Sequence, residues 1–457
     1  MNTIKEVVLR QKKFSDLGTS KDVSFRISQL QKLKKILKDN ESLLCEAIYE
    51  DIKKSKFETY VTELALVYNE IDVCIKNLDK WSKPLKVNTN ILNLPAKSFI
   101  ISEPYGTTLI IGAWNYPYQL TLAPLVATLA AGNTAIVKPS ELPVKTSATL
   151  KKIINENFNP DYLHVIEGGV EVTQELLSYP YGKICFTGST TVGKIVARAA
   201  AEHLTPVLLE LGGKSPCFVF EDADLKLAAK RIAWGKYLNA GQTCIAPDYL
   251  LIHSSIYDKF LDELKDQIQH IVGDNALTSE SYTRIINERN VQRLKKLIEP
   301  EKVFFGGKVI ESENYIEPTI LKNIGWDDEV MQEEIFGPIF PAIPFDDLNS
   351  VIAKIKEGPK PLALYMFTKS ESIQSKILKE ISFGGGCVND TIMHIANHHL
   401  PFGGVGGSGM GNYHGEHGFK TFSHQKSIVK KTFWFEPSMK YAPYTDGKLK
   451  LLRRIFG

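Results

Sequence analysis

The sequence lacks the cysteine spacing that is typical of disulfide frameworks and zinc sites. Its six cysteines are spread along the 457 residues, and none forms a CxxC pair with another. Isolated cysteines fit reduced thiols in a cytosolic protein, so we expect no disulfides. His394, His398 and His399 lie close together, but no cysteine or carboxylate stands at ligand spacing around them. They are expected to be loop residues, and no metal site is predicted.

An excess of charge of one sign and a long apolar run are also missing. The 55 basic side chains nearly balance the 52 acidic ones, so the formal charge of +3 gives no reason to expect nucleic acid as a partner. The first 16 residues are polar and contain no apolar stretch of the kind that a secretory signal needs. The longest apolar run, 121–137, is interrupted by Pro124 and Gly132 and falls short of a membrane-spanning helix. These absences predict a cytoplasmic protein.

What the sequence does contain is an alternation of apolar strands and amphipathic helices. A chain of this length exceeds one hydrophobic core and predicts two or three domains. Between residues 107 and 213, and again from 217 to about 404, the alternation indicates βαβ units with a parallel sheet covered on both faces. In the first region we predict strands at 108–112, 134–137, 163–166, 183–186 and 206–209, with helices at 118–131, 144–158, from 172 and at 191–203. Ligands of such sheets bind at the carboxyl ends of the strands.

The flanking regions have other patterns. Apolar positions recur at helical spacing over 23–84, whereas 85–103 favours extended chain or a hairpin that pairs outside its own domain. Beyond Gly418 the chain is β-rich, and from Asp446 it is short and basic.

One cysteine differs from the others in its setting. Cys244 ends the stretch Ala240-Gly241-Gln242-Thr243-Cys244, between small and polar neighbours just beyond a long helical pattern. Such a position suits a nucleophile, although a small buried core thiol is the simpler interpretation of any single cysteine.

Two glycine patterns resemble nucleotide-binding motifs. The stretch 404–409 matches GxGxxG, but Pro401-Phe402 precedes it instead of a strand, so we reject a dinucleotide fingerprint there. The stretch 188–194 starts like a P-loop between a strand and a helix, yet Ile195 replaces the hydroxyl that would hold magnesium. What remains is Gly188 and Ser189 at a helix N-terminus, which is a seat for a pyrophosphate.

Three further polar groups stand at strand ends. Lys138 and Glu141 could bind ribose hydroxyls or form a solvated surface pair, and the Asn115 amide could donate to an oxyanion or serve only its own turn. Glu210 ends an apolar strand, where burial should raise its pKa and make it a usable base, although backbone donors could satisfy it instead. The 34 residues from Glu210 to Cys244 span a strand and a helix, which permits both side chains to reach one site.

Four motifs in order resemble the aldehyde dehydrogenase superfamily. They are Phe186-Thr187-Gly188-Ser189, Glu210-Leu211-Gly212-Gly213-Lys214, Gly241-Gln242-Thr243-Cys244 and Glu333-Glu334-Ile335-Phe336-Gly337-Pro338. The stretches 245–249, 387–390 and 401–404 make the chain most similar to the class 3 branch, which includes fatty aldehyde dehydrogenases.

The resemblance implies a Rossmann-type cofactor domain, an α/β catalytic domain and a small β oligomerisation element. We assign 1–84 and 103–212 to the first, 213–411 to the second, and 85–102 with 412–445 to the third, followed by a basic tail at 446–457. A homodimer is implied, with the extended segments at its interface.

The same resemblance assigns a role to each residue of the site. Cys244 is the nucleophile, Asn115 holds the oxyanion and Glu210 activates the hydrolytic water. Lys138 and Glu141 contact the adenosine ribose, and Gly188 with Ser189 the pyrophosphate. Glu334 and Phe336 contact the nicotinamide ribose and ring.

These roles describe oxidation of an aldehyde to an acid through a cysteine thiohemiacetal and a thioester, with NAD(P) as cofactor. Glu141 should repel a 2′-phosphate, so NAD is expected to be preferred and NADP to be usable. Aromatic residues such as Tyr60, Trp114, Tyr116 and Trp234 suit medium or long aliphatic and aromatic aldehydes, although core packing explains them equally well.

Two other functions remain open. One is a dehydrogenase that passes the acyl group to coenzyme A, against which Glu210 argues, and the other is a catalytically silent binding protein on the same fold. The tail mixes bases with large apolar residues, so it either associates peripherally with a membrane surface, packs on a partner subunit or is disordered.

Overall fold

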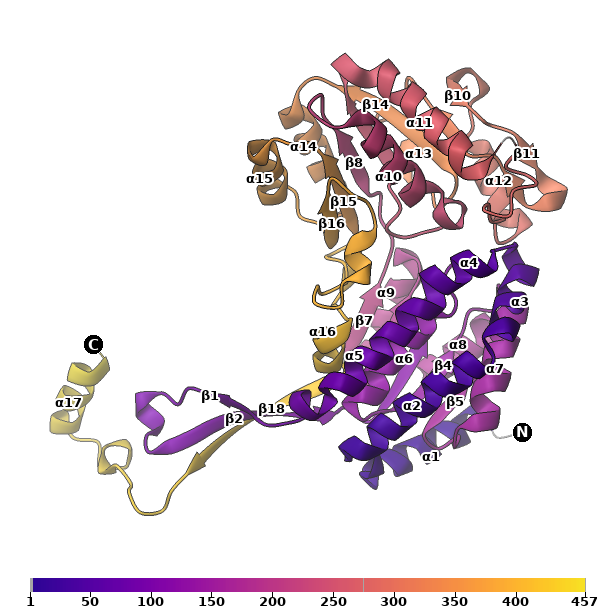
Figure 1. Ribbon diagram of the computed structural model, residues 1–457. Coiled ribbons are helices and arrows are strands. Elements are labelled where there is room, and N and C mark those ends of the chain that lie inside the picture. Colours follow the sequence, from indigo (N-terminus) through magenta and orange to yellow (C-terminus); the bar gives the residue numbers. More distant parts are fainter. Residues whose placement is uncertain (1–2, 274, 457) are drawn as a thin grey trace.

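The computed structural model describes residues 3–273 and 275–456. It contains two parallel α/β sheets in two lobes and a long antiparallel arm that projects from one of them (Figure 1). The α/β architecture predicted from the alternating pattern is confirmed.

The first sheet has six strands in the order β17-β7-β6-β3-β4-β5, of which only β17 is antiparallel. Its strands are β3 (Thr107–Ile111), β4 (Thr134–Lys138), β5 (Leu163–Val165), β6 (Lys183–Thr187), β7 (Val207–Glu210) and β17 (Gly409–Met410). The chain runs outward from β3 to β5 on one side and from β6 to β7 on the other. The order therefore reverses between β3 and β6, which is where such sheets bind ligands.

The strands of this sheet bury alternate residues on opposite faces. Leu109 and Ile111 belong to one apolar cluster, with α1, α8 and α9, whereas Ile110 belongs to the other, with α2, α5, α6 and α7. These helices are α1 (Ile4–Asp16), α2 (Val23–Asp39), α5 (Ala65–Trp81), α6 (Gln119–Ala131), α7 (Val144–Asn157), α8 (Val170–Leu177) and α9 (Thr190–Ala201). Because α6 is covered by α2 and α5 as well as by the sheet, all its residues are buried.

The second sheet has seven strands in the order β10-β13-β14-β9-β8-β15-β16, parallel except for β10. They are β8 (Pro216–Val219), β9 (Tyr249–His253), β10 (Val303–Phe305), β13 (Thr319–Leu321), β14 (Ile339–Phe345), β15 (Ala363–Phe367) and β16 (Gly385–Val388). The helices of this lobe are α10 (Leu225–Tyr237), α11 (Tyr257–Val272), α12 (Glu288–Lys296), α13 (Glu329–Gln332), α14 (Leu348–Glu357) and α15 (Glu371–Glu380). A separate ribbon pairs β11 (Val309–Ile310) with β12 (Tyr315–Ile316).

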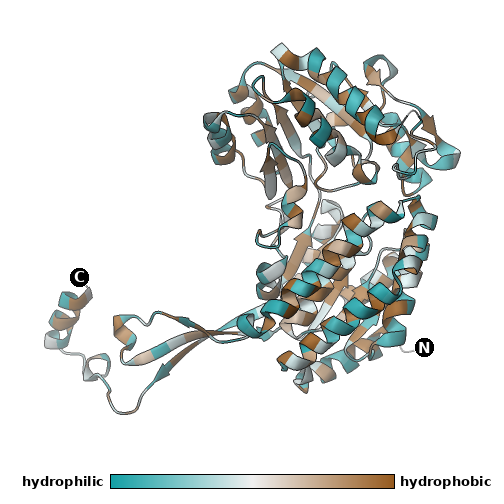
Figure 2. Cartoon of the chain, viewed as in Figure 1, coloured by the Kyte–Doolittle hydropathy of each residue, from teal (hydrophilic) through white to brown (hydrophobic). Residues whose placement is uncertain are grey.

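The arm pairs two segments that are more than 300 residues apart in the sequence. Strand β2 (Ala96–Pro104) lies between β1 (Leu85–Val87) and β18 (Ser423–Lys431), antiparallel to both. Figure 2 shows hydrophobic and hydrophilic residues mixed along this arm, which stands away from both lobes.

Two helices lie where the sequence pattern indicated none. The chain after Tyr413 first forms α16 (Gly415–Thr421), which packs on α5 and α6, before it becomes β18. The basic tail forms α17 (Asp446–Phe456) beyond the arm (Figure 1). Among the described residues, no helix has both the length and the apolar character needed to cross a membrane.

Candidate active site

A cavity of about 610 Å³ opens at the carboxyl ends of β3, β4, β6 and β7. All nine residues singled out from the sequence line it. They are Asn115, Lys138, Glu141, Gly188, Ser189, Glu210, Cys244, Glu334 and Phe336. The six-stranded sheet supplies the first six, and segments of the other lobe supply the last three. The cavity thus lies between the lobes, beside the reversal of strand order.

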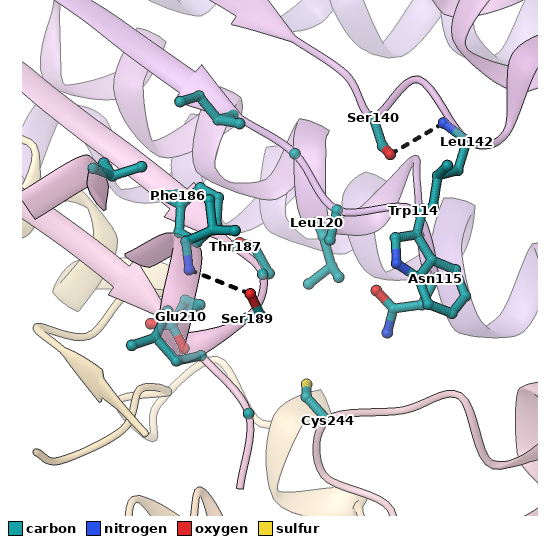
Figure 3. Close-up of a pocket in the computed structure, with 18 of the residues that line it drawn as sticks. Trp114, Asn115, Leu120, Ser140, Leu142, Phe186, Thr187, Ser189, Glu210 and Cys244 are labelled. Atoms are coloured by element: carbon teal, nitrogen blue, oxygen red, sulfur yellow. Dashed lines mark hydrogen bonds between the residues drawn. The ribbon is translucent and has the colours of Figure 1, made fainter. Parts of the chain in front are cut away.

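The turn before Cys244 is built from left-handed backbone. After α10 ends at Tyr237, Asn239 and Ala240 have φ of 53° and 50°, and Gly241 has φ of 73°. A side chain at Gly241 would overlap the carbonyl oxygen of Gly337. The chain leaves α10 through this strained turn, which directs the sulfur of Cys244 into the cavity (Figure 3). Cys244 is half-buried, whereas Cys45, Cys74, Cys185 and Cys217 are fully buried core thiols.

Asn115 lies across the cavity from Cys244 and is fixed by the same turn. Its Nδ2 donates to the backbone carbonyl of Gln242 at 3.0 Å, and its backbone carbonyl accepts from Nδ2 of Asn239 at 2.8 Å. A carboxamide carries two N–H groups, so one remains for an oxygen in the cavity. Figure 3 shows the Asn115 carboxamide facing the sulfur.

Glu210 ends β7 with its carboxylate buried. Neither of its oxygens has a hydrogen-bond partner within the described part of the chain. Burial raises the pKa of this carboxyl well above its usual value. A buried carboxyl without partners is destabilised as the anion, and it therefore accepts a proton readily from water or from a thiol.

The Cys244 thiol is itself a weak acid in this environment. Burial, and then the nearby carboxylates of Glu334 and Glu210, raise its pKa. The thiol is therefore protonated at neutral pH, and forming the thiolate requires a neighbouring base or a positive charge.

The cavity also has groups suited to a sugar and a phosphate. Lys138 Nζ lies 2.7 Å from Glu141 Oε2 directly after β4. Partial burial acts to raise the pKa of Glu141, but the hydrogen bond from Lys138, a backbone hydrogen bond and the charge of Lys138 together outweigh it and lower the value. Ser189 caps α9 by accepting from the Val192 backbone N–H, so the positive end of that helix faces the cavity.

The segment 333–336 closes the cavity from the other lobe. The Glu334 carboxylate packs against Gly212, where an added Cβ would overlap it. Burial and the proximity of Asp248 raise the pKa of Glu334 to about 8. Phe336 has φ of 50°, and its ring meets the Trp114 ring edge-on, with 5.3 Å between the ring centroids.

Three residues position this segment, a role that the sequence did not assign to them. Lys214 Nζ lies 2.6 Å from Asp248 Oδ2 and donates to the carbonyl of Glu333, while Asp248 Oδ1 accepts from the Ile335 N–H at 3.0 Å. Arg293 donates to the Ile335 carbonyl at 2.7 Å. All three residues are far from 333–336 in the chain, so their spacing in the sequence gave no indication of these contacts.

An apolar part of the cavity was also missed. Leu142, Val170, Val192 and Ile195 line it and are 38–67% exposed. Leu142 precedes α7, Val170 begins α8, and Val192 and Ile195 lie within α9. The signal that the sequence offered was an aliphatic residue at a position expected to face solvent. The open surface of these four residues suits a flat ring.

The aromatic residues named from the sequence separate into three settings. Trp114 lines the cavity. Tyr116 is buried, and its hydroxyl lies 2.7 Å from Thr243 Oγ1. Tyr60 and Trp234 are partly exposed and do not line this cavity. No group of three histidine, cysteine or acidic side chains within the described ranges is placed to hold a metal ion.

The cavity fits a dinucleotide on structural grounds. It lies at the reversal of strand order, contains a helix N-terminus for phosphates, an exposed aliphatic wall for a base, and polar groups at Lys138, Glu141 and Glu334 for two sugars. The carboxylate of Glu210, which has no hydrogen-bond partner among the described residues, and the thiol of Cys244 line the same cavity.

Comparison with known proteins gives the same picture. The aldehyde dehydrogenase family matches residues 10–428. The chain is 46% identical to the 4,4'-diaponeurosporen-aldehyde dehydrogenase of Staphylococcus aureus, with 100% of both chains covered. It is 44% identical to aldehyde dehydrogenase family 3 member A2 of Pongo abelii, over 96% of this chain and 92% of the relative.

A further relative and a solved structure complete the comparison. The dimeric NADP-preferring aldehyde dehydrogenase of Canis lupus familiaris is 43% identical, over 99% of this chain and 100% of the relative. The substrate-bound state of Staphylococcus aureus AldH superposes with a TM-score of 0.97 at 46% identity, covering 100% of both chains. The resemblance to the class 3 branch and the fold predicted with it are therefore confirmed, and this chain belongs to the aldehyde dehydrogenase family as an NAD(P)-dependent enzyme that oxidises aldehydes.

Proposed function

We propose that Cys244, Asn115 and Glu210 carry out this oxidation in the roles expected from the sequence. The observation that supports the proposal is that a thiol, a carboxamide N–H and an unpartnered buried carboxylate line one cavity. Cys244 releases its proton to solvent and adds to the aldehyde carbon as the thiolate, and the Asn115 amide donates to the oxyanion of the thiohemiacetal. A bound nicotinamide dinucleotide supplies the acceptor for hydride from this adduct. Glu210 then takes a proton from water, which attacks the resulting thioester and releases the acid.

Glu210 also favours water over coenzyme A as the acyl acceptor. Transfer to a thiol such as coenzyme A has little need for a buried base at this place, whereas water must lose a proton as it attacks.

The test uses two single variants with NAD and a medium-chain aldehyde. Cys244→Ser should abolish formation of reduced cofactor, and Asn115→Ala should lower kcat about 100-fold because one oxyanion donor is lost. Carboxylic acid should be the product without added coenzyme A. Activity of Cys244→Ser near that of the wild type would refute the assignment.

We infer a preference for NAD over NADP. Glu141 is anionic and half-exposed beside Lys138, where a 2′-phosphate would meet its negative charge. A relative is named NADP-preferring, so the ratio of kcat/KM for the two cofactors is the deciding measurement. Glu141→Gln should shift that ratio toward NADP, and a wild-type preference for NADP would refute the inference.

For the substrate we propose apolar aldehydes of medium or long chain, aliphatic or aromatic. Trp234 on α10 and Tyr60 beside α4 (Lys56–Thr59) expose apolar surface outside the cavity. The Thr391 hydroxyl donates to the Arg231 carbonyl of α10 at 2.8 Å, and Ile395, Ala396 and His398 line a small pocket together with Leu66 and Asn69 of α5. Met393, two residues after Thr391, is also exposed. Rising kcat/KM with aldehyde chain length would support this proposal.

We propose the domain division given above and a homodimer formed through the arm. The dimeric relative and the exposed apolar residues Leu85, Val87 and Val429 on the arm support it. Sedimentation equilibrium of the full chain measures the state directly, and a monomer would refute it.

The tail is proposed to bind a membrane surface weakly, which would give a cytoplasmic protein a peripheral location. Helix α17 carries Lys448, Lys450 and two arginines, with Leu449, Leu451 and Ile455 exposed. Flotation with anionic liposomes compares the full chain with a version ending at Tyr444. Equal flotation would refute the proposal.

A further inference from the structure

Three charged side chains of the segment 54–63 are buried beside the turn 239–244 that carries Cys244. Lys54 and Glu63 are fully buried, with Lys54 Nζ 2.7 Å from Glu63 Oε1, and Glu58 is only 8% exposed. Removing such charges from water is costly unless each of them is paired. Their contacts reach both sides of the space between Cys244 and Asn115.

The contacts of Glu63 lead to the side of Asn115. Its Oε2 accepts from the Tyr118 N–H at 2.7 Å and from the Gln119 N–H at 3.4 Å. These groups lie at the start of α6, three and four residues after Asn115. Glu63 itself lies in a π-helical turn at Tyr60–Leu64, a rare geometry that is frequent at functional sites.

The contacts of Glu58 lead to the side of Cys244. Its Oε1 accepts from the Asn239 N–H at 2.7 Å, and its Oε2 accepts from the Thr283 hydroxyl at 3.3 Å. Asn239 is the first left-handed residue of the turn that presents Cys244. A left-handed residue other than glycine costs free energy, so it persists where surrounding contacts determine it.

Lys54 connects the two sides. Its ammonium lies 4.1 Å from the centroid of the Tyr116 ring, and the Tyr116 hydroxyl lies 2.7 Å from Thr243 Oγ1. Tyr116 follows Asn115 directly, and Thr243 directly precedes Cys244. A cation over an aromatic face holds the ring in place.

We propose that Glu58, Lys54 and Glu63 form a buried brace that sets the position of Cys244 relative to Asn115, and that Glu58 is a positioning residue for the oxidation. The inference rests on the roles proposed for Cys244 and Asn115. Glu58 touches neither the aldehyde nor the reacting atoms, since it acts through the backbone of Asn239.

The test compares Glu58→Ala with Glu58→Gln in the full chain, by steady-state kinetics with NAD. Glu58→Ala removes the acceptor for Asn239, and kcat should fall about 10- to 100-fold, as expected for a displaced catalytic group, while KM for NAD changes little. Glu58→Gln keeps an oxygen for Asn239 and should recover kcat to within about three-fold of the wild type. Glu46→Gln, at an exposed position of α3 (Glu41–Ile52), is the matched control and should behave as wild type.

A double-mutant cycle separates positioning from a general loss of stability. In an Asn115→Ala background, Glu58→Ala should lower kcat by less than about three-fold, because the alignment it supports no longer matters. Equal losses in the two backgrounds, or wild-type kcat in a folded Glu58→Ala protein, would overturn the brace.

A second variant covers the case in which Glu58→Ala does not fold. Tyr116→Phe removes only the hydroxyl that meets Thr243, and kcat should fall several-fold with KM for NAD unchanged; full activity would overturn the brace. The roles proposed for Cys244 and Asn115 are tested independently of the brace, by Cys244→Ser and Asn115→Ala alone. If those two variants lose activity while the Glu58 variants keep it, only the brace is refuted.

Discussion

The two walls of the cavity present their functional groups by different means. On the wall formed by the six-stranded sheet, which we call the sheet wall, Asn115, Lys138, Ser189 and Glu210 stand at or just beyond the ends of β3, β4, β6 and β7. On the opposite wall, the turn wall, Cys244 and Phe336 belong to segments 239–244 and 333–337, with positive φ at four residues.

The difference shows how much support each wall needs. A parallel strand places its carboxyl end by regular backbone hydrogen bonds, so Lys138, Ser189 and Glu210 need little help beyond the fold, whereas Asn115 is also held by Asn239 and Gln242. The strained turns of the other wall are fixed by buried polar contacts from distant segments, through Glu58 to Asn239 and through Lys214, Asp248 and Arg293 to 333–336. Damage to the turn wall should therefore affect stability and geometry together.

The largest effect is expected on the sheet wall at Glu210. Glu210→Gln should lower steady-state kcat by about 100-fold or more, because the thioester loses its general base. A burst of about one reduced cofactor per active site should remain, since hydride leaves before hydrolysis. Rapid mixing measures it, and unchanged steady-state turnover would contradict the role.

The pH profile of the same enzyme follows from the pKa of Glu210. Only the ionised carboxylate accepts a proton, and burial raises its pKa, so hydrolysis should increase with pH through a value well above that of an ordinary glutamate. The rising limb of kcat should disappear in Glu210→Gln. A profile identical in the two proteins would assign the base elsewhere.

Gly241→Ala tests the turn wall. The substitution adds a Cβ at φ of 73° and overlaps the Gly337 carbonyl oxygen, so the free energy of unfolding should fall by about 2–4 kcal/mol. Gly18→Ala is the matched control, because φ is 76° in the left-handed region there and the added Cβ would meet only the end of the Lys21 side chain at 3.8 Å. Denaturant unfolding should show a loss of only about 1 kcal/mol for the control; equal losses would mean that the overlap is relieved.

A glycine of the sheet wall should respond differently. Gly212→Ala meets only the carboxylate end of Glu334, a flexible side chain that can move away. Stability should change little, while KM for NAD rises about 10-fold, or 1.4 kcal/mol, as Glu334 is displaced. A large loss of stability with unchanged KM would remove the distinction between the two walls.

The smallest effect is expected at the cap of α9. Ser189→Ala removes the acceptor for the Val192 N–H and should lower the free energy of unfolding by about 1 kcal/mol, with a modest rise in KM for NAD. Ser370→Ala removes the corresponding cap of α15, which accepts from the Ile373 N–H outside the cavity. It should cost similar stability and leave KM unchanged. A matching rise in KM would show that the Ser189 effect is indirect.

Prediction from the sequence succeeded where periodicity is local. The strands ending at Lys138, Thr187 and Glu210 and the helix before Cys244 follow from apolar alternation, and strand ends of a parallel sheet share an edge, so grouping Lys138, Ser189 and Glu210 required no coordinates. The helix α16 was not anticipated, because seven residues with four polar side chains form it only by packing on α5 and α6.

The sequence by itself determined the α/β fold, the family and the chemistry available to the site, because hydrophobic period and motif order are written along the chain. Only the tertiary structure decided that Glu210 has no hydrogen-bond partner among the described residues, that Asn239, Ala240 and Gly241 are left-handed, and that Glu58 lies against that turn from 181 residues away. The reason is that burial and hydrogen bonding between remote segments depend on how the two lobes pack, which no local pattern encodes.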